Sequence, residues 1–399
     1  MTDLERMLPL WCELETTGAN YILATVVAVE GSSYRKPGAR MVLAEDGRRA
    51  GTVSGGCLEA EVARRSWWLT AKGPVVERYS TAADDGDRPY GSGCGGVVWL
   101  LLERRETAAP LLAALEAAFT GRTPLAIATV LDGARIGQRA FAGLPEAPAA
   151  IPRLPNAGDQ AASPALQRLA ERALDGRASM GERVVLEGGE ASAWADYRPA
   201  RPGLWVFGAG DDARPLVRLA RELGWFVAVA DGRSNLATRD RFPTAEQVSV
   251  LAIAELAAAK QAAGGRTGGD AWASEATVSG VKPTDAAAVM THSFEQDARI
   301  LAALLSLASP PAYLGVLGPR RRTRELLAEA ARLLGAPDRL DRVEHWLDLL
   351  HAPMGLDLGA ETPAAIALSI LAEIQQTLTA ATGLPLRAVR GDNIAAEQA

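Results

Sequence analysis

The chain has 399 residues, of which 48% are hydrophobic and 23% are charged, and its formal net charge is −6. Its length predicts two or three domains at roughly 150 residues per domain, each able to bury a core. The acidic balance argues against a general affinity for nucleic acid or for an anionic membrane surface. We expect no signal peptide, and no apolar run approaches the roughly 20 residues that span a membrane. These features predict a soluble, cytoplasmic protein.

The first half of the chain predicts a mixed α/β domain over residues 1–200. Runs rich in β-branched residues predict strands at 21–30, 41–44, 48–53, 75–80, 97–103, 125–130, 183–186 and 191–197. Helical patterns cover 57–70 and 108–120. Residues 144–165 are rich in Pro, Ala and Gly and predict a loose loop, and residues 199–203 (PARPG) predict a linker.

From residue 204 the pattern changes to a regular alternation of strands and helices. Strands are expected at 204–207, 225–230, 247–251, 286–290 and 312–317. Helices are expected to end near Leu223, to cover 294–308 and 321–334, and to begin again at Pro363. This alternation predicts an α/β fold, a Rossmann-like doubly wound parallel sheet over 201–385, followed by a tail at 386–399. Residues 262–285 look like a variable insertion.

A glycine-rich turn follows the first strand of this second domain. Gly208 and Gly210 match the G-x-G-x-x-G/A pattern of dinucleotide-binding turns. Asp231 ends the next strand, where a carboxylate accepts a hydrogen bond from the ribose of NAD. Asp211 and Asp212 would repel a phosphate group at the start of the helix, so we expect weak or no NAD binding. The alternative is that the glycines serve only the turn and the packing of the helix.

Two of the three cysteines are flanked by glycines. Cys57 follows Gly55 and Gly56 and is expected at the start of a helix, a position that lowers the pKa of a thiol. Cys94 lies in the open loop 91–96 (GSGCGG). Both positions leave room for a ligand or a sulfur donor, and we expect the two thiols to approach each other or a common cleft. The alternative is a pair of buried, inert thiols. Three cysteines and three histidines exclude a disulfide framework and a four-cysteine metal site.

Polar side chains also follow the later strands of the second domain. Arg320, Arg321 and Arg322 stand at the start of the helix after strand 312–317. They are candidate phosphate ligands, because ligands bind at this edge of open α/β sheets, or else a solvated basic helix start. His292 follows another strand end, where Ser293 and Gln296 predict a capping box.

A loop with several glycines precedes the last long helix. Thr362 and Pro363 predict the N-cap and the first residue of that helix. Asp357 and Glu361 lie in the loop itself, whose glycines allow a close approach of the backbone to another group. These two acids are either polar contacts to a ligand or ordinary loop acids.

Several stretches of the chain, taken together, carry a family resemblance. In the first half they are EGSSYRKPGARM (30–41), GTVSGGCLEAEV (51–62) and GCGG (93–96). In the second half they are VFGAG (206–210), VADGR (229–233), RFP (241–243), VMTH (289–292), YLGVLGPRRR (313–322) and GLDLGAETPAAIALSILAEI (355–374). The set, in this order, resembles the XdhC/CoxI family of accessory proteins for the maturation of xanthine dehydrogenase and carbon monoxide dehydrogenase.

The resemblance implies a protein that binds the molybdenum cofactor, of the molybdopterin type. It implies that the protein protects this cofactor, supports its sulfuration with a cysteine desulfurase, and inserts it into a molybdenum hydroxylase of the xanthine or carbon monoxide dehydrogenase type. Such a chaperone has no turnover of its own, and we expect no catalytic residue. The sequence leaves a homodimer open.

The candidate cofactor contacts come from both domains. Cys57 and Cys94 would hold the molybdenum or a transferred sulfur. The other candidates are Gly55, Gly56, Gly208, Gly210, Asp231, His292, Arg320, Arg321, Asp357 and Glu361. The alternative function is an NAD-dependent oxidoreductase that uses the Rossmann-like domain, with His292 or His351 as its acid or base. A third alternative is a scaffold for the desulfurase and its client, which needs no pocket.

Overall fold

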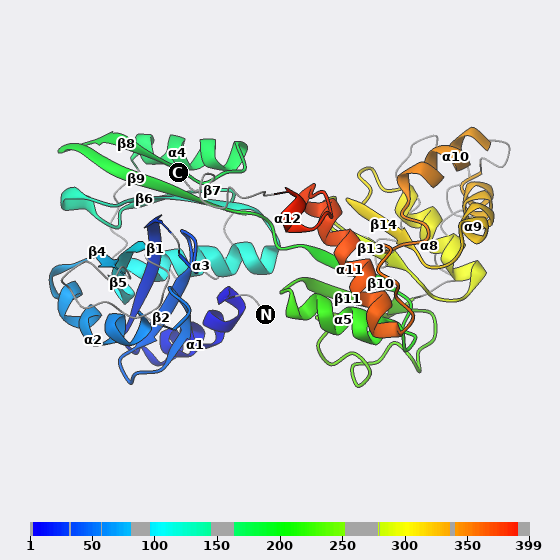
Figure 1. The fold of residues 1–399 in the computed structure, drawn as a ribbon, viewed down its shortest axis with the longest axis horizontal. Helices are drawn as coiled ribbons and strands as arrows, with labels where there is room; N and C mark the ends of the chain where they lie inside the picture. The colour runs from blue at the N-terminus through cyan, green and yellow to red at the C-terminus, as the bar shows by residue number, and fades with distance from the viewer. Residues whose placement is uncertain are drawn as a thin grey trace. The chain divides into compact units, whose positions relative to one another are not determined.

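The computed structural model describes residues 3–31, 33–56, 58–80, 96–144, 163–251, 278, 280–335 and 340–389. The chain forms two compact units that divide between Arg201 and Pro202 (Figure 1). This division falls inside the stretch 199–203 that the sequence predicts as a linker. Within the described ranges, none of the helices combines the length and the apolar character that crossing a membrane requires.

The N-terminal unit contains two antiparallel sheets. The five-stranded sheet has the order β3 (Arg49–Gly51), β2 (Arg40–Ala44), β1 (Tyr21–Glu30), β5 (Val97–Arg104), β4 (Val75–Ser80). The four-stranded sheet has the order β7 (Arg139–Ala142), β6 (Leu125–Val130), β9 (Gly189–Arg198), β8 (Met180–Leu186). The helices of this unit are α1 (Asp3–Thr17), α2 (Glu59–Leu69), α3 (Arg105–Gly121) and α4 (Pro164–Asp175), with short 3-10 turns at Thr70–Lys72 and Gly133–Arg135.

Successive side chains of β1 and of β6 point to opposite faces of their sheets, so each strand contributes to two hydrophobic cores. Tyr21 and Leu23 of β1 pack in one core with α1, α3 and Leu125 of β6. The opposite face of β1 packs in a second core with Leu58 and Val62 at α2, and the opposite face of β6 packs against α4. Helices α1 and α3 therefore pack on the inner faces of both sheets, α2 covers the outer face of the five-stranded sheet, and α4 covers the outer face of the four-stranded sheet.

Two buried ion pairs join the two sheets. Arg40 of β2 donates to Asp196 of β9, with 2.7 Å between Nη2 and Oδ2. Arg139 of β7 donates to Glu103 of β5, whose side chain is fully buried. Buried charges need partners, so each pair fixes how one sheet faces the other.

The C-terminal unit is the doubly wound parallel sheet that the sequence predicts. Its strand order is β12 (Gln247–Val250), β11 (Phe226–Asp231), β10 (Gly203–Phe207), β13 (Ala286–Val289), β14 (Tyr313–Val316). One face packs on α8 (Phe294–Leu305), α9 (Arg320–Leu333) and α10 (Leu340–Leu349). The other face packs on α5 (Ala213–Glu222) and α11 (Pro363–Thr379). The short α12 (Leu386–Val389) follows, inside the stretch predicted as a tail.

The sequence prediction lacks α1, α4, β7 and α10. The first helix contains Pro9, and α4 begins at Pro164, inside the stretch predicted as a loop. A proline such as Pro164 stands easily in the first turn of a helix, so it is a poor sign of a loop. Strand β7 has only four residues, too few to show an alternating pattern alone. Residues 145–162 of the predicted loop and most of the predicted insertion 262–285 lie outside the described residues.

Candidate functional site

The loop between β3 and α2 is organised around one carboxylate. Glu59, the first residue of α2, is buried and accepts hydrogen bonds from the backbone N–H groups of Val53 (3.1 Å), Ser54 (2.9 Å) and Gly55 (3.3 Å). The hydroxyl groups of Thr52 and Ser54 donate to the same carboxylate, at 2.6 Å for Ser54. Glu59 therefore fixes residues 52–55, the segment that leads to Cys57.

The hydrogen bonds to Glu59 also control its charge. Burial would raise the pKa of this carboxyl, but the hydrogen bonds from Ser54 and Thr52 outweigh burial and lower the pKa to about 2. The group is therefore a carboxylate at neutral pH, and the start of α2 favours that negative charge. Glu59 is absent from the site residues predicted from the sequence. Its one signal there was an acid in the first turn of a helix after a polar loop.

The two glycines before Cys57 are required for different reasons. Gly55 (φ +99°) lies against the ring of Tyr34, since a Cβ at this position would be 2.7 Å from the ring carbon Cδ1. Gly56 (φ +122°) has open space around it, so only its backbone conformation favours glycine. Cys57 and Cys94 lie outside the described residues, and their predicted approach to each other stays a prediction.

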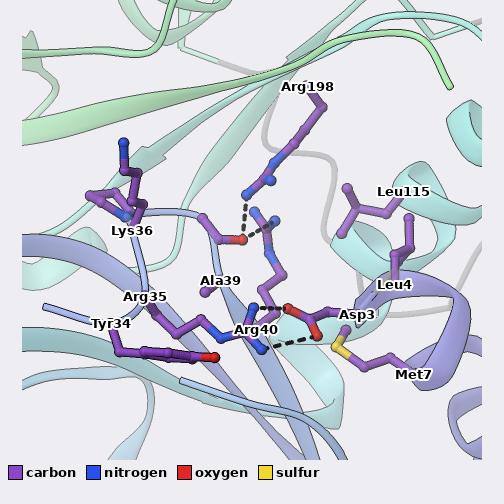
Figure 2. Close-up of a pocket in the computed structure, with 12 residues that line it drawn as sticks. Asp3, Leu4, Met7, Tyr34, Arg35, Lys36, Ala39, Arg40, Leu115 and Arg198 are labelled. Carbon is purple, nitrogen blue, oxygen red and sulfur yellow. Dashed lines mark hydrogen bonds and ion pairs between the residues drawn. The ribbon is translucent and has the colours of Figure 1, made fainter. Parts of the chain in front are cut away.

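A basic cavity lies beside this loop, in the same unit. It has a volume of about 460 Å³ and is lined by α1, the loop 34–40, Leu115 of α3 and Arg198 at the end of β9. We call this space the basic cavity. Figure 2 shows Arg35 paired with Asp3, and the guanidinium groups of Arg40 and Arg198 pointing toward one another. The loop 30–41 contributes to the family resemblance, but none of its residues is among the site residues predicted from the sequence.

The glycine turn of the C-terminal unit packs tightly against a neighbouring strand end. Gly208 (φ +131°) follows β10, and a Cβ at this position would overlap with the carbonyl group of Met290, after β13. A Cβ at Gly210 would meet nothing closer than 3.7 Å. The packing interpretation of the motif therefore explains Gly208 without a ligand.

Asp231 is engaged by groups of its own unit. It is fully buried, and its two oxygens accept from Ala209 N (2.7 Å) and from Arg233 N, Nε and Nη2 (2.8, 2.9 and 2.7 Å). Burial would raise the pKa of Asp231, but the hydrogen bonds from Arg233 and Ala209 outweigh burial and lower it. In this structure the carboxylate that the sequence assigns to a ribose closes the turn, and its role as a cofactor contact stays a prediction.

The two aspartates expected to repel phosphate each have a cationic or imidazole partner. Asp211 Oδ1 lies 2.9 Å from Arg241 Nη2, and Asp212 Oδ2 lies 2.9 Å from His292 Nε2. His292 itself has a positive φ of 63°, an uncommon conformation for a residue with a side chain. The charge argument against NAD is therefore weaker than the sequence suggests, and the bonds of Asp231 supply a stronger one.

We expect calorimetric titration of the full chain with NAD to show no affinity in the micromolar range. The Asp231 oxygens that would accept from a ribose already accept from four N–H groups, and those bonds would have to break for NAD to bind. A dehydrogenase with a known NAD site, titrated from the same solution, is the control. Micromolar affinity of this chain would contradict the prediction.

A second cavity opens at the carboxyl ends of β13 and β14. It has a volume of about 270 Å³, and its lining includes His292, Asp297, Gly318 and Arg322. Arg322 Nη2 lies 2.6 Å from Asp297 Oδ2, and Asp297 is buried. Of the three consecutive arginines that the sequence predicts as phosphate ligands, Arg322 is therefore the one at the cavity. Asp297 is not among the site residues predicted from the sequence.

The side chains of Arg320 and Arg321 are exposed and line neither of the two cavities. Their nearest acids, Asp348 and Glu325, are each 3.8 Å away. Exposed pairs of this length contribute little to stability. Both side chains are accessible to an anion, and their role as phosphate ligands stays a prediction.

The capping box predicted before α8 is half formed. Ser293 Oγ accepts from Gln296 N at 3.4 Å, as an N-cap does. The reciprocal bond is absent from the described contacts, because Gln296 Oε1 accepts from Gly232 N (3.3 Å) and Ser293 N donates to Thr291 Oγ1 (3.1 Å). Gln296 instead ties the start of α8 to the end of β11.

The glycine loop before α11 approaches its own helix. Glu373 of α11 accepts from Gly355 N (2.6 Å) and from the hydroxyl of Tyr313 (2.7 Å), and it lies 3.1 Å from His351 Nδ1. A Cβ on Gly355 would be 2.6 Å from Ser369 Oγ, which explains the glycine. The N-cap at Thr362 and the helix start at Pro363 are confirmed.

Asp357 and Glu361 are exposed, and their ligand contacts stay predictions. Gly208, His292 and Gly318 follow parallel strands and Asp231 ends one, so the structure brings all four to one edge of the sheet. In the part of the chain that the structure describes, no three His, Cys, Asp or Glu side chains are grouped to hold a metal ion.

The fold and these sites define an α/β protein with two units. The N-terminal unit carries the loop before Cys57 and the basic cavity. The C-terminal unit has a Rossmann-like sheet whose glycine turn is held by a hydrogen bond to Asp231. Residues 204–374 match the XdhC Rossmann domain, and residues 14–80 match the XdhC and CoxI family. The chain belongs to the XdhC and CoxI family, as the resemblance implied.

Individual proteins similar to this chain agree with the family match. The chain is 28% identical over 373 residues to a protein of Bacillus subtilis named as a probable xanthine dehydrogenase subunit, and the match covers 89% of this chain and 92% of that one. It is 38% identical over 117 residues to the "Molybdenum cofactor insertion chaperone PaoD" of Escherichia coli, covering 29% of this chain and 36% of PaoD. A crystal structure described as a xanthine dehydrogenase from Bacillus halodurans superposes with a TM-score of 0.64 at 26% identity, over 95% of this chain and 96% of that one.

Proposed function

We propose that this protein carries the molybdenum cofactor as cargo and inserts it into a molybdenum hydroxylase of the xanthine or carbon monoxide dehydrogenase type. The observation that carries the proposal is the 38% identity to the chaperone PaoD over 117 residues, together with the family matches in both units. The name of the Bacillus subtilis relative supports a client of the xanthine dehydrogenase type. In this proposal the protein has no turnover of its own.

The residues of the N-terminal unit fit such a cargo. The cofactor is an anionic organic phosphate, and the basic cavity offers arginine and lysine side chains to an anion. The Nε atoms of Arg35 and Arg40 are buried without a hydrogen-bond partner among the described residues. Glu59 fixes the segment before Cys57, whose thiol would contact the molybdenum or carry the sulfur that a cysteine desulfurase supplies. Cys94 would act with Cys57 in this step.

Loading the full chain with cofactor tests the proposal. The purified protein is mixed with molybdenum cofactor freshly released from a molybdenum enzyme and then passed through a desalting column. We expect molybdenum and pterin to leave the column with the protein, measured by elemental analysis and by pterin fluorescence after oxidation. The loaded protein should also activate a cofactor-free molybdenum hydroxylase. Wild-type protein that retains neither molybdenum nor pterin would contradict the proposal.

A cysteine comparison sharpens this experiment. We expect Cys57→Ser to lose at least about tenfold of the retained molybdenum, because a serine hydroxyl, unlike a thiol, does not deprotonate near neutral pH and cannot carry a transferred sulfur. Cys12→Ser is the matched control, since Cys12 is a free cysteine of α1 beside Glu116 and outside the loop. Equal retention by the two variants would remove Cys57 from the site.

A further inference from the structure

The basic cavity holds more positive than negative charge. Arg35, Lys36, Arg40 and Arg198 line it, and Asp3 is the one acid in its lining. Asp3 pairs with Arg35 at 2.7 Å. Asp196, behind the cavity, is shared by Arg40 and Arg198 at 2.7 and 2.8 Å, so one carboxylate serves two guanidinium groups. Lys36 is exposed and has no ion-pair partner among the described residues.

Two of these arginines keep hydrogen-bond donors that the chain does not use. Arg40 is buried, and it donates to Asp196 through Nη2 and to the carbonyl of Gly38 through Nη1 (3.0 Å). Its Nε–H has no acceptor among the described residues, and neither has the Nε–H of Arg35. An unpaired buried donor costs free energy, so both side chains favour an acceptor oxygen beside them.

The backbone is shaped to admit Arg198. Gly38 has a φ of +91°, and a Cβ at this position would overlap with the guanidinium group of Arg198. Arg198 donates to the Gly38 carbonyl from this position and faces Arg40 (Figure 2). Burial lowers the pKa of Arg40 to about 10, and the charge of Arg198 contributes to this shift. An anion placed between these side chains would relieve the repulsion.

Tyr34 connects the cavity to the loop that carries Cys57. Its side chain lines the cavity, and 73% of the residue is exposed. On the other side its ring lies against Gly55, two residues before Cys57. A ligand with a phosphate group close to its metal centre could therefore reach both places at once. The molybdenum cofactor is such a ligand, because its phosphate is attached to the ring that bears the sulfur ligands of the metal.

We propose that the basic cavity is the phosphate subsite of this protein, in which Arg35, Lys36 and Arg198 bind the phosphate group of the cargo. The identity of the cargo rests on the proposed function, whereas the affinity of the cavity for phosphate does not. Arginine and lysine recognise phosphate through charge-assisted hydrogen bonds. The exposed ring of Tyr34 offers a flat surface beside them.

The first experiment measures the affinity of the protein for inorganic pyrophosphate, without the cofactor. The full chain is titrated with inorganic pyrophosphate by calorimetry at constant ionic strength. We expect measurable binding by the wild type, weakened about tenfold or more by Lys36→Glu and by Arg198→Gln. Lys72→Glu is the matched control, because Lys72 is an exposed lysine of the same unit outside the cavity. Wild-type protein without affinity, or cavity variants that bind like the control, would overturn the proposal.

The second experiment measures retention of the molybdenum cofactor by the same variants, with circular dichroism to show that each is folded. We expect Lys36→Glu to lose most of the bound pterin and Lys72→Glu to keep it. The double variant Arg320→Ala, Arg321→Ala tests the competing phosphate ligands that the sequence predicts in the C-terminal unit. Cofactor retained by Lys36→Glu and lost by the double variant would move the phosphate subsite to the C-terminal unit and overturn our proposal, with the proposed function intact. Pyrophosphate bound as expected, without cofactor retention by the wild type, would contradict only the proposed function.

Discussion

Arg139→Met will destabilise the N-terminal unit by about 3–5 kcal/mol, the range found when one partner of a buried ion pair is removed. The substitution leaves Glu103 without its cation, and Glu103 is fully buried between the two sheets. It also removes the hydrogen bond from Arg139 Nη1 to the carbonyl of Thr107 (2.9 Å). Urea denaturation of the full chain, with hydrogen exchange of peptides from β1 and β10 to separate the two units, measures the effect.

The pH dependence of this variant has a definite sign. Burial already raises the pKa of Glu103, with Arg139 opposing the rise, so loss of Arg139 raises the pKa further. A carboxyl whose folded pKa is raised causes no penalty at low pH, where it is protonated in both states. The deficit of Arg139→Met should therefore be smallest near pH 4 and grow as the pH increases. A deficit that shrinks with increasing pH would contradict this assignment.

An exposed arginine of the same unit provides the control. Arg48 pairs with Glu13 and Asp46 on the surface, at 2.8 and 2.7 Å. Its distances resemble those of a buried pair, but water solvates all three groups. We expect no measurable change in stability from Arg48→Met. Equal losses from the two substitutions would mean that burial does not decide the strength of these pairs.

The sequence predicts the C-terminal unit strand by strand but not the layers of the N-terminal unit. Strands such as β10 and β13 are short apolar runs separated by helices, and this alternation admits one architecture. In the N-terminal unit, by contrast, Glu103 and Arg139 look like ordinary surface residues in the sequence. Only the folded chain shows that they meet between two sheets, so the arrangement of these sheets could not be predicted.

The sequence likewise predicts some features of the candidate sites and not others. The sequence places Gly208 and Asp231 correctly at the ends of strands, because both belong to a pattern within one βαβ unit. It cannot show that Arg233 and Ala209 use the carboxylate of Asp231. The basic cavity could not be predicted from the sequence for a further reason. Arg198 is far from the loop 34–40 in the sequence and reaches it only because β9 ends beside that loop.

Glu59→Gln will destabilise the loop before Cys57 and reduce cofactor retention. The amide of glutamine turns an N–H₂ group toward N–H and O–H donors, so at least one hydrogen bond to a charged acceptor is lost, at a cost of about 1.5–3 kcal/mol. Hydrogen exchange should rise first in residues 53–55, whose N–H groups donate to Glu59. Glu61→Gln is the matched control. Glu61 is in the same helix turn but forms its ion pairs with Arg64 and Arg65, and such pairs contribute about 0.3–0.5 kcal/mol.

Acid titration separates the charge of Glu59 from the shape of its side chain. Its folded pKa is about 2, below the 4.5 of an ordinary glutamate, so the carboxylate stabilises the folded state at every pH above 4.5. This stabilisation, about 3 kcal/mol for a shift of this size, is lost as the pH falls from 4.5 to 2. The difference in unfolding free energy between the wild type and Glu59→Gln should therefore be constant near neutral pH and shrink toward zero near pH 2. A difference that stays constant down to pH 2 would show that Glu59 acts by shape alone.

The role of Glu59 in the proposed function is to position Cys57, and this can be distinguished from general stability. Under conditions where both variants are folded, Glu59→Gln should lose molybdenum at least about tenfold more readily than Glu61→Gln. Its binding of pyrophosphate should stay close to that of the wild type, because the loop 34–40 and Arg198 make the basic cavity without Glu59. Loss of both ligands would show that Glu59 supports the whole unit. Loss of molybdenum with pyrophosphate binding intact would assign it to the thiol end of the site.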